Sequence, residues 1–77
     1  MTIQEYENCL KSYKSGFGED LSGHTLFELK LKFAHAQTEF NKCASSEKDL
    51  LLRKSNLLDM LCLGFEDYHR DIAGGGK

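Results

Sequence analysis

Residues 57–65 place the strongest limit on how this chain can fold, because seven of these nine residues are large, apolar or sulfur-bearing. In a helix they divide between two sides. Leu57, Leu58, Leu61 and Phe65 lie on one side, and Met60 and Leu63 point away from it. Full burial of a large apolar side chain stabilises a fold by about 1.5–3 kcal/mol. Because one partner helix cannot cover both sides, we expect helices to meet here and a second chain to contribute to covering this segment.

A chain of 77 residues forms one domain and buries a limited share of its surface, so its stability is marginal unless a second subunit, a metal or a disulfide adds to it. The absence of proline permits long helices. We expect a single helical domain over residues 1–73, followed by a flexible glycine-rich tail at 74–77.

The first helix is predicted at roughly residues 3–14. Thr2 and Glu5 have the spacing of a capping box, in which each side chain satisfies a free backbone N–H at a helix start. Apolar residues then recur at helical spacing: Ile3, Tyr6, Leu10 and Tyr13. Gly16 and Gly18 flank Phe17, which favours a turn over 15–20 with the aromatic ring turned inward.

The second helix, over about 25–43, has the clearest periodicity in the sequence. Thr25 and Glu28 form a second capping-box pair. The apolar positions follow a 3,4 spacing typical of a narrow packing seam: Leu26, Leu29, Phe33, Ala36, Phe40 and Cys43. Phe27 and Leu31 lie off this seam and indicate a second contact surface.

The last helix is predicted from about 47 to 72, with Gly64 admitting a close neighbour. Its seam is shifted by four residues from the earlier one. Such a shift fits either a stutter within one long helix or a turn between two helices. We favour a turn at 44–46, with Ser46 as the N-cap, because folding back lets the two seams bury each other.

These patterns predict an all-α fold with a short N-terminal helix and an antiparallel two-helix hairpin, forming a dimeric helical bundle. The expected function is that of a small protein–protein interaction module or regulator that acts through an apolar helix surface. That surface comprises Phe27, Leu31, Leu57, Met60, Leu61, Leu63 and Phe65. Phe27, Met60 and Leu63 are the most diagnostic members because the seams within the chain do not need them.

The charge pattern limits the classes of partner. Ten basic and twelve acidic residues alternate along the chain and give a net charge of −2, without the basic stripe of most nucleic-acid binders. A nucleic-acid-associated regulator therefore stays a minor alternative. No apolar run reaches the roughly 20 residues of a membrane span, and the polar N-terminus is unlike a signal peptide. We expect a cytoplasmic protein that binds another protein and forms a homo-oligomer.

No catalytic residue, metal ligand or cofactor is predicted. Cys9, Cys43 and Cys62 are an odd number without a C-x-x-C pair, so we interpret them as reduced thiols, with an intersubunit disulfide as the alternative. Cys62, Glu66 and His69 share one side of the last helix. They lack a fourth ligand at a recognised zinc spacing.

The last helix is locally acidic through Asp59, Glu66, Asp67 and Asp71. The simpler interpretation is a solvated face that keeps the protein soluble. The alternative is docking to a basic partner, including the region of Lys30 and Lys32 in a second copy.

Ser55-Asn56-Leu57-Leu58-Asp59 resembles the Ser-Gln-x-x-Asp signature of the small helical-hairpin phosphatases that act on sporulation response regulators. Asn56 stands where that signature has glutamine. The resemblance implies an amide that positions water and an aspartate near an acyl phosphate. A phosphatase-like regulator is therefore an alternative function.

Overall fold

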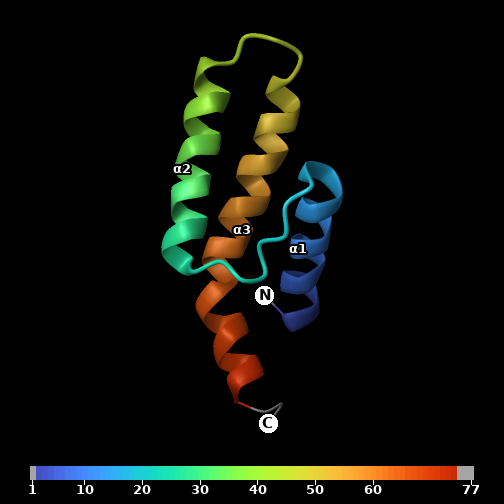
Figure 1. Cartoon of the computed structure of the whole chain (residues 1–77), viewed down its shortest axis with the longest axis vertical. Coiled ribbons are helices and arrows are strands. Elements are labelled where there is room, and N and C mark those ends of the chain that lie inside the picture. The colour runs from blue at the N-terminus through green and yellow to red at the C-terminus, as the bar shows by residue number, and fades with distance from the viewer. Residues whose placement is uncertain (1, 75–77) are drawn as a thin grey trace.

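A computed structural model describes residues 2–74, which form three α-helices and no strand (Figure 1). The helices are α1 (Ile3–Phe17), α2 (Leu26–Lys42) and α3 (Lys48–Ala73). The all-helical prediction is confirmed. Of the predicted flexible tail, residues 75–77 lie outside the described part of the chain.

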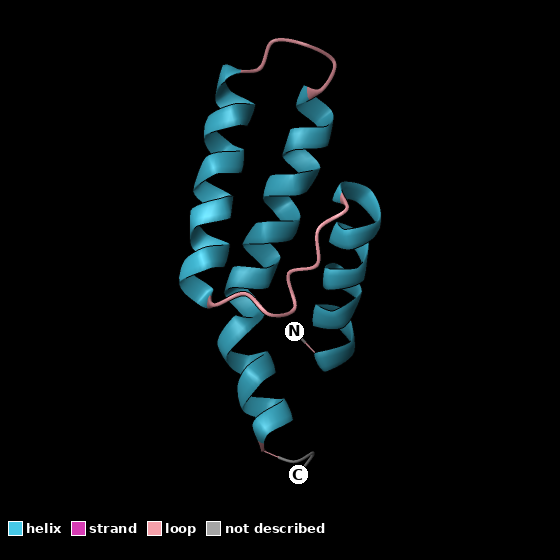
Figure 2. Ribbon diagram, viewed as in Figure 1, coloured by secondary structure: helices cyan, strands magenta, loops and turns pink. Residues whose placement is uncertain are grey.

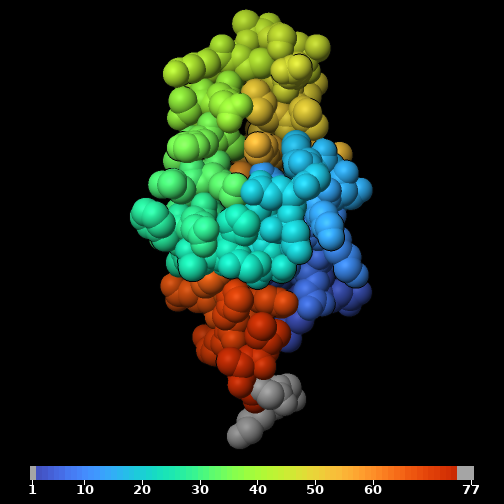
Figure 3. Space-filling model, in the orientation of Figure 1, coloured from blue at the N-terminus to red at the C-terminus, as the bar shows by residue number. Residues whose placement is uncertain are grey.

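Helix α3 is the element against which the other two pack, and it runs along most of the 47 Å length of the molecule. α2 lies beside its first half and α1 beside a lower part, both running opposite to α3 (Figure 1). The segment 18–25 joins α1 to α2 across the front face (Figures 2 and 3). The last turns of α3 extend past the end of α2 (Figure 2).

Both predicted capping boxes are present. At the start of α1, the Glu5 backbone N–H donates to Thr2 Oγ1 at 3.1 Å, and the Thr2 N–H donates to the Glu5 carboxylate at 2.9 Å. Thr25 and Glu28 make the same pair of bonds at 3.2 and 3.0 Å. Each box satisfies two backbone donors that the helix itself cannot reach.

Helix α1 is longer than predicted, because it continues through Gly16 and ends after Phe17. Gly18 adopts a left-handed conformation with φ of 74°, and its N–H donates to the Lys14 carbonyl at 2.8 Å. Phe17 packs on Tyr13 with their ring centroids 4.9 Å apart. The extra turn places this half-buried ring against the core.

The predicted break between the last two helices is confirmed, since residues 43–47 separate α2 from α3. The predicted N-cap at Ser46 is wrong. Glu47 occupies that position without a side-chain capping bond, and its backbone N–H donates to Ser45 Oγ at 3.3 Å. Ser45 Oγ also lies 3.2 Å from Cys43 Sγ. Ser45 therefore stabilises this short connection through these two contacts, in place of a side-chain N-cap.

All three helices and the 18–25 segment contribute to one hydrophobic core. Its buried members are Tyr6, Cys9, Tyr13, Leu21, Leu29, Ala36, Leu58 and Leu61. The predicted seam of α2 is buried or half-buried at every position. Leu21, from the segment between α1 and α2, is a core residue that the helical spacing did not identify.

Candidate interaction surface

Large apolar side chains remain exposed on the outer faces of α2 and α3. The two most exposed are Leu63 at 75% and Phe27 at 71%. Leu31 at 49% and Met60 at 41% are also exposed. These are the four predicted surface residues that lie off the packing seams. Leu63 lines a groove between α2 and α3, whereas Leu31 lines a separate hollow on α2 with His24 and His35.

The other three predicted surface residues lie closer to the core. Leu61 is completely buried, and Leu57 and Phe65 are half-buried against the core cluster. Helix α1 packs on α3 and supplies one of the two contacts that residues 57–65 were expected to need. The side that carries Leu63 has no third helix among residues 2–74.

A groove of about 650 Å³ runs between α2 and α3. Leu26, Lys30 and Phe33 line it from α2, and Asp59, Cys62, Leu63, Glu66 and Asp67 line it from α3. Phe27 does not line the groove itself, but it precedes Lys30 by three residues and so lies on the same face of α2. We call these nine residues the groove surface. It combines an apolar centre with charged edges, as the sites that accept amphipathic helices do.

Among residues 2–74, three of the charged groups at the groove edges form no ion pair. The ion pairs of residues 2–74 are formed by other groups, and Lys30, Asp59 and Glu66 take part in none of them. Asp67 differs, because it accepts a hydrogen bond from Arg70 at 2.9 Å. The groove surface therefore offers one unpaired ammonium and two unpaired carboxylates.

Cys62 behaves as a small apolar residue of the groove. Burial, followed by the charge of Asp59, raises the pKa of its thiol above the ordinary value, while Lys30 acts in the opposite direction. A protonated thiol is a weak nucleophile and a weak metal ligand. Cys9, Cys43 and Cys62 are all free in the structure.

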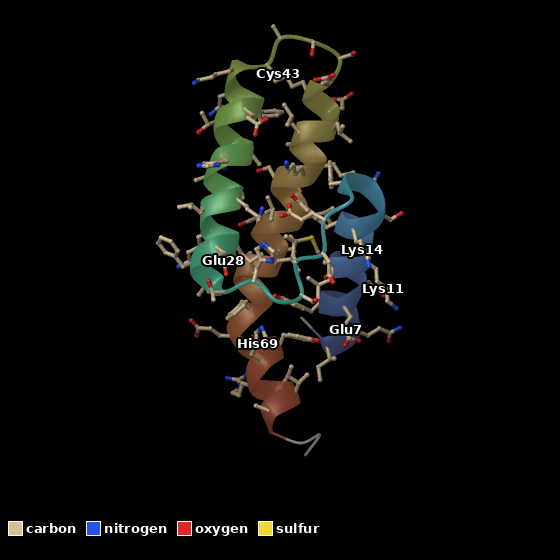
Figure 4. The ribbon with its side chains drawn as sticks, in the orientation of Figure 1. Glu7, Lys11, Lys14, Glu28, Cys43 and His69 are labelled. Atoms are coloured by element: carbon tan, nitrogen blue, oxygen red, sulfur yellow. The ribbon has the colours of Figure 1, made fainter. Side chains whose placement is uncertain are left out.

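The side chains that could have formed a metal site do not gather around one. His69 packs on Phe65, with ring centroids 4.2 Å apart, and its ring lies edge-on to Tyr6 at 6.5 Å. Among residues 2–74, no three His, Cys, Asp or Glu side chains are placed to hold an ion together. His69 contributes to aromatic packing near the lower end of α3, where Figure 4 labels it.

The residues of the phosphatase-like signature are divided between environments. Ser55 is buried on the packed side of α3, Asn56 is exposed, and Asp59 is half-buried at the groove. Asp59 thus shares its surroundings with Lys30 and Glu66 rather than with Ser55.

The sequence did not reveal the groove itself, and it indicated Lys30 only as part of a basic region that could meet the acidic residues of a second copy. Leu26 and Phe33 were assigned only to the seam of the second helix, and Cys62 was interpreted as a reduced thiol. A signal was present, since Lys30 follows Leu26 by four residues and Asp59 follows Ser55 by four. Positions directly beside an a/d seam are those where charges meet a neighbouring helix.

Comparisons with protein-family models, with curated proteins and with solved structures find no match for this chain. Within residues 2–74, no helix is both long and apolar enough to cross a membrane.

Proposed function

We propose that this chain is a small helical protein–protein interaction module, which binds helices of another protein chain at the groove surface and self-associates there into a dimeric bundle. The observation that carries this proposal is the exposure of Phe27 and Leu63 beside a groove with an apolar centre. Three free thiols favour a reducing compartment, so we place its action in the cytoplasm.

The energetic argument rests on the size of these side chains. Removing apolar surface from water yields about 25 cal/mol per Å². Phe27 and Leu63 are mostly in water and contribute little of this to the folded single chain. A partner helix in the groove would cover both of them, and would also complete the burial of half-buried Phe33 and Cys62. Aromatic side chains beside a pocket are frequent energetic centres of interfaces.

The test is sedimentation equilibrium over a wide concentration range, with the wild-type chain compared with Phe27→Glu/Leu63→Glu. We expect concentration-dependent association of the wild type and a monomeric variant of unchanged helical content by circular dichroism, because both substitutions are at exposed positions. Leu50→Glu is the matched control. It also replaces an exposed leucine of α3, 52% exposed, and does not line the groove.

A wild-type chain that stays monomeric up to millimolar concentration would contradict the proposed self-association. Equal weakening by Leu50→Glu would place the interface elsewhere on α3.

A further inference from the structure

The charges of the groove surface follow an arrangement that restricts which partner it fits. Lys30 stands on the α2 edge, and Asp59 and Glu66 stand on the α3 edge. A purely basic helix would pair with the two carboxylates but would place a like charge beside Lys30, and a purely acidic helix would be repelled by the two carboxylates. The best complement carries carboxylates opposite α2 and an ammonium opposite α3.

A second copy of the same chain has this pattern. Lys30 lines the same groove as Asp59 and Glu66, which stand two turns apart on α3, about 10 Å along its axis. A twofold axis parallel to the helices would place α2 of one copy against α3 of the other at the same height. Lys30 of each copy would then face Asp59 and Glu66 of its partner, so that one symmetric interface forms two charge clusters.

Helix directions and spacing agree with this packing. α2 and α3 run in opposite directions (Figure 1), so the twofold axis would make every neighbouring pair of helices antiparallel, as in an up-and-down four-helix bundle. Each outer face also has a stripe of residues three and four apart, in which Phe27, Leu52 and Leu63 are the large apolar members. The residues are 27, 30, 34, 37 and 41 on α2, and 52, 56, 59, 63 and 66 on α3. Phe27 and Leu63 belong to these stripes and would meet across the axis.

From this arrangement we infer that the groove surface binds a second copy of this chain in a twofold, antiparallel four-helix bundle, with Lys30 of each protomer set against Asp59 and Glu66 of the other. The inference rests on the proposed function and adds to it the partner, the symmetry and the charge contacts. α1 would lie outside the bundle core, since it packs on α3 away from the groove.

The test is a charge exchange measured by sedimentation equilibrium. Lys30→Glu alone and Glu66→Lys alone should each weaken self-association about tenfold or more, because each places like charges against one another in both clusters. An equimolar mixture of the two variants should form a heterodimer of nearly wild-type affinity, since Glu at 30 then meets Lys at 66. The double variant Lys30→Glu/Glu66→Lys should recover the homodimer for the same reason.

Lys11→Glu is the matched control for the change in net charge. Lys11 lies on the outer side of α1 (Figure 4) and does not line the groove. We expect it to leave association unchanged. Raising the salt concentration should restore part of the association of Lys30→Glu, because ions screen the repulsion between exposed like charges.

The outcomes separate this inference from the proposed function. If the wild type associates and Phe27→Glu/Leu63→Glu abolishes association, but the charge variants behave like the wild type, the four-helix arrangement is wrong and the interaction surface stands. The arrangement is also wrong if each charge variant is monomeric and the mixture fails to recover. A wild-type chain that is monomeric throughout would overturn both.

Discussion

Tyr6 and Tyr13 attach α1 to the core, and their burial changes their acid–base behaviour. Burial raises the pKa of each phenol to about 12. Tyr6 also stacks on Tyr68, with ring centroids 4.1 Å apart and an angle of 14° between the planes. Tyr68 in turn donates a hydrogen bond to Glu7 at 3.2 Å.

These shifts predict a loss of stability at high pH. An unfolded tyrosine ionises near its ordinary pKa of about 10, whereas the folded phenols stay neutral until about 12. Their contribution to stability is therefore complete below pH 10 and is lost as the pH rises through 12. In urea unfolding measured between pH 8 and pH 12, Tyr6→Phe should reduce the steepness of this loss. Identical pH dependence of variant and wild type would contradict the assignment.

A second prediction at this scale compares two leucines of α3. Leu58 is completely buried, whereas Leu63 is 75% exposed. Leu58→Ala should lower the free energy of unfolding by about 2–5 kcal/mol through lost burial and a residual cavity. Leu63→Ala should change it by less than about 0.5 kcal/mol. Chemical denaturation of the two variants, at concentrations low enough to keep the chain monomeric, checks the difference.

Single residues of the helices were predictable where periodicity decides their side, as for Leu29, Ala36 and Leu58. Leu21 was not, because it lies between helices, where no repeat indicates which side chain turns inward. It is nevertheless among the most buried residues of the chain, at 1% exposure.

At the scale of the element, α1 shows how a helix end is determined. The sequence places glycines at 16 and 18, and either could end the helix. The left-handed backbone occurs at Gly18, and the helix includes Gly16. The helix that continues through Gly16 brings Phe17 onto Tyr13, four residues earlier, with their ring centroids 4.9 Å apart.

The two glycines should respond oppositely to alanine. Gly16→Ala should raise stability by about 0.5–1 kcal/mol, since Gly16 is helical and a Cβ there meets nothing within 4 Å. Gly18→Ala should lower stability by about 1 kcal/mol, because L-residues disfavour a φ of 74°. Thermal unfolding followed by circular dichroism compares the stability of the two variants. A stabilised Gly18→Ala variant would contradict the assignment of a left-handed conformation to Gly18 at the end of α1.

At the scale of the whole molecule, the packing contacts of α1 and α2 are distributed unevenly along α3. Its middle lies between α1 and α2, whereas its first turns are accompanied by α2 alone (Figure 1). Leu50 and Leu52 in those turns are about half exposed, at 52% and 44%. The sequence indicated that residues 57–65 needed two contacts. Periodicity could not show which side of α3 helix α1 would cover, because the path of the 18–25 segment determines where α1 lies.

This uneven distribution of contacts predicts that local stability differs along α3. In native-state hydrogen exchange, amides of α3 near Leu58 and Leu61 should be the most protected. Amides at 50–53 should exchange about tenfold faster or more, because fewer buried contacts must break to open them. Uniform protection along α3 would show instead that the helix opens only in global unfolding.

The stacking of Tyr6 on Tyr68 joins residues that are far apart in the sequence, and this has a consequence for synthesis. A chain that leaves the ribosome presents α1 well before the second half of α3 exists. Helix α1 therefore cannot pack on α3 until translation has almost reached the end of α3. Until then, Tyr6, Cys9 and Tyr13 lack their packing partners in α3. During that interval, these three residues form an apolar surface that a chaperone would bind. The folded protein no longer exposes that surface.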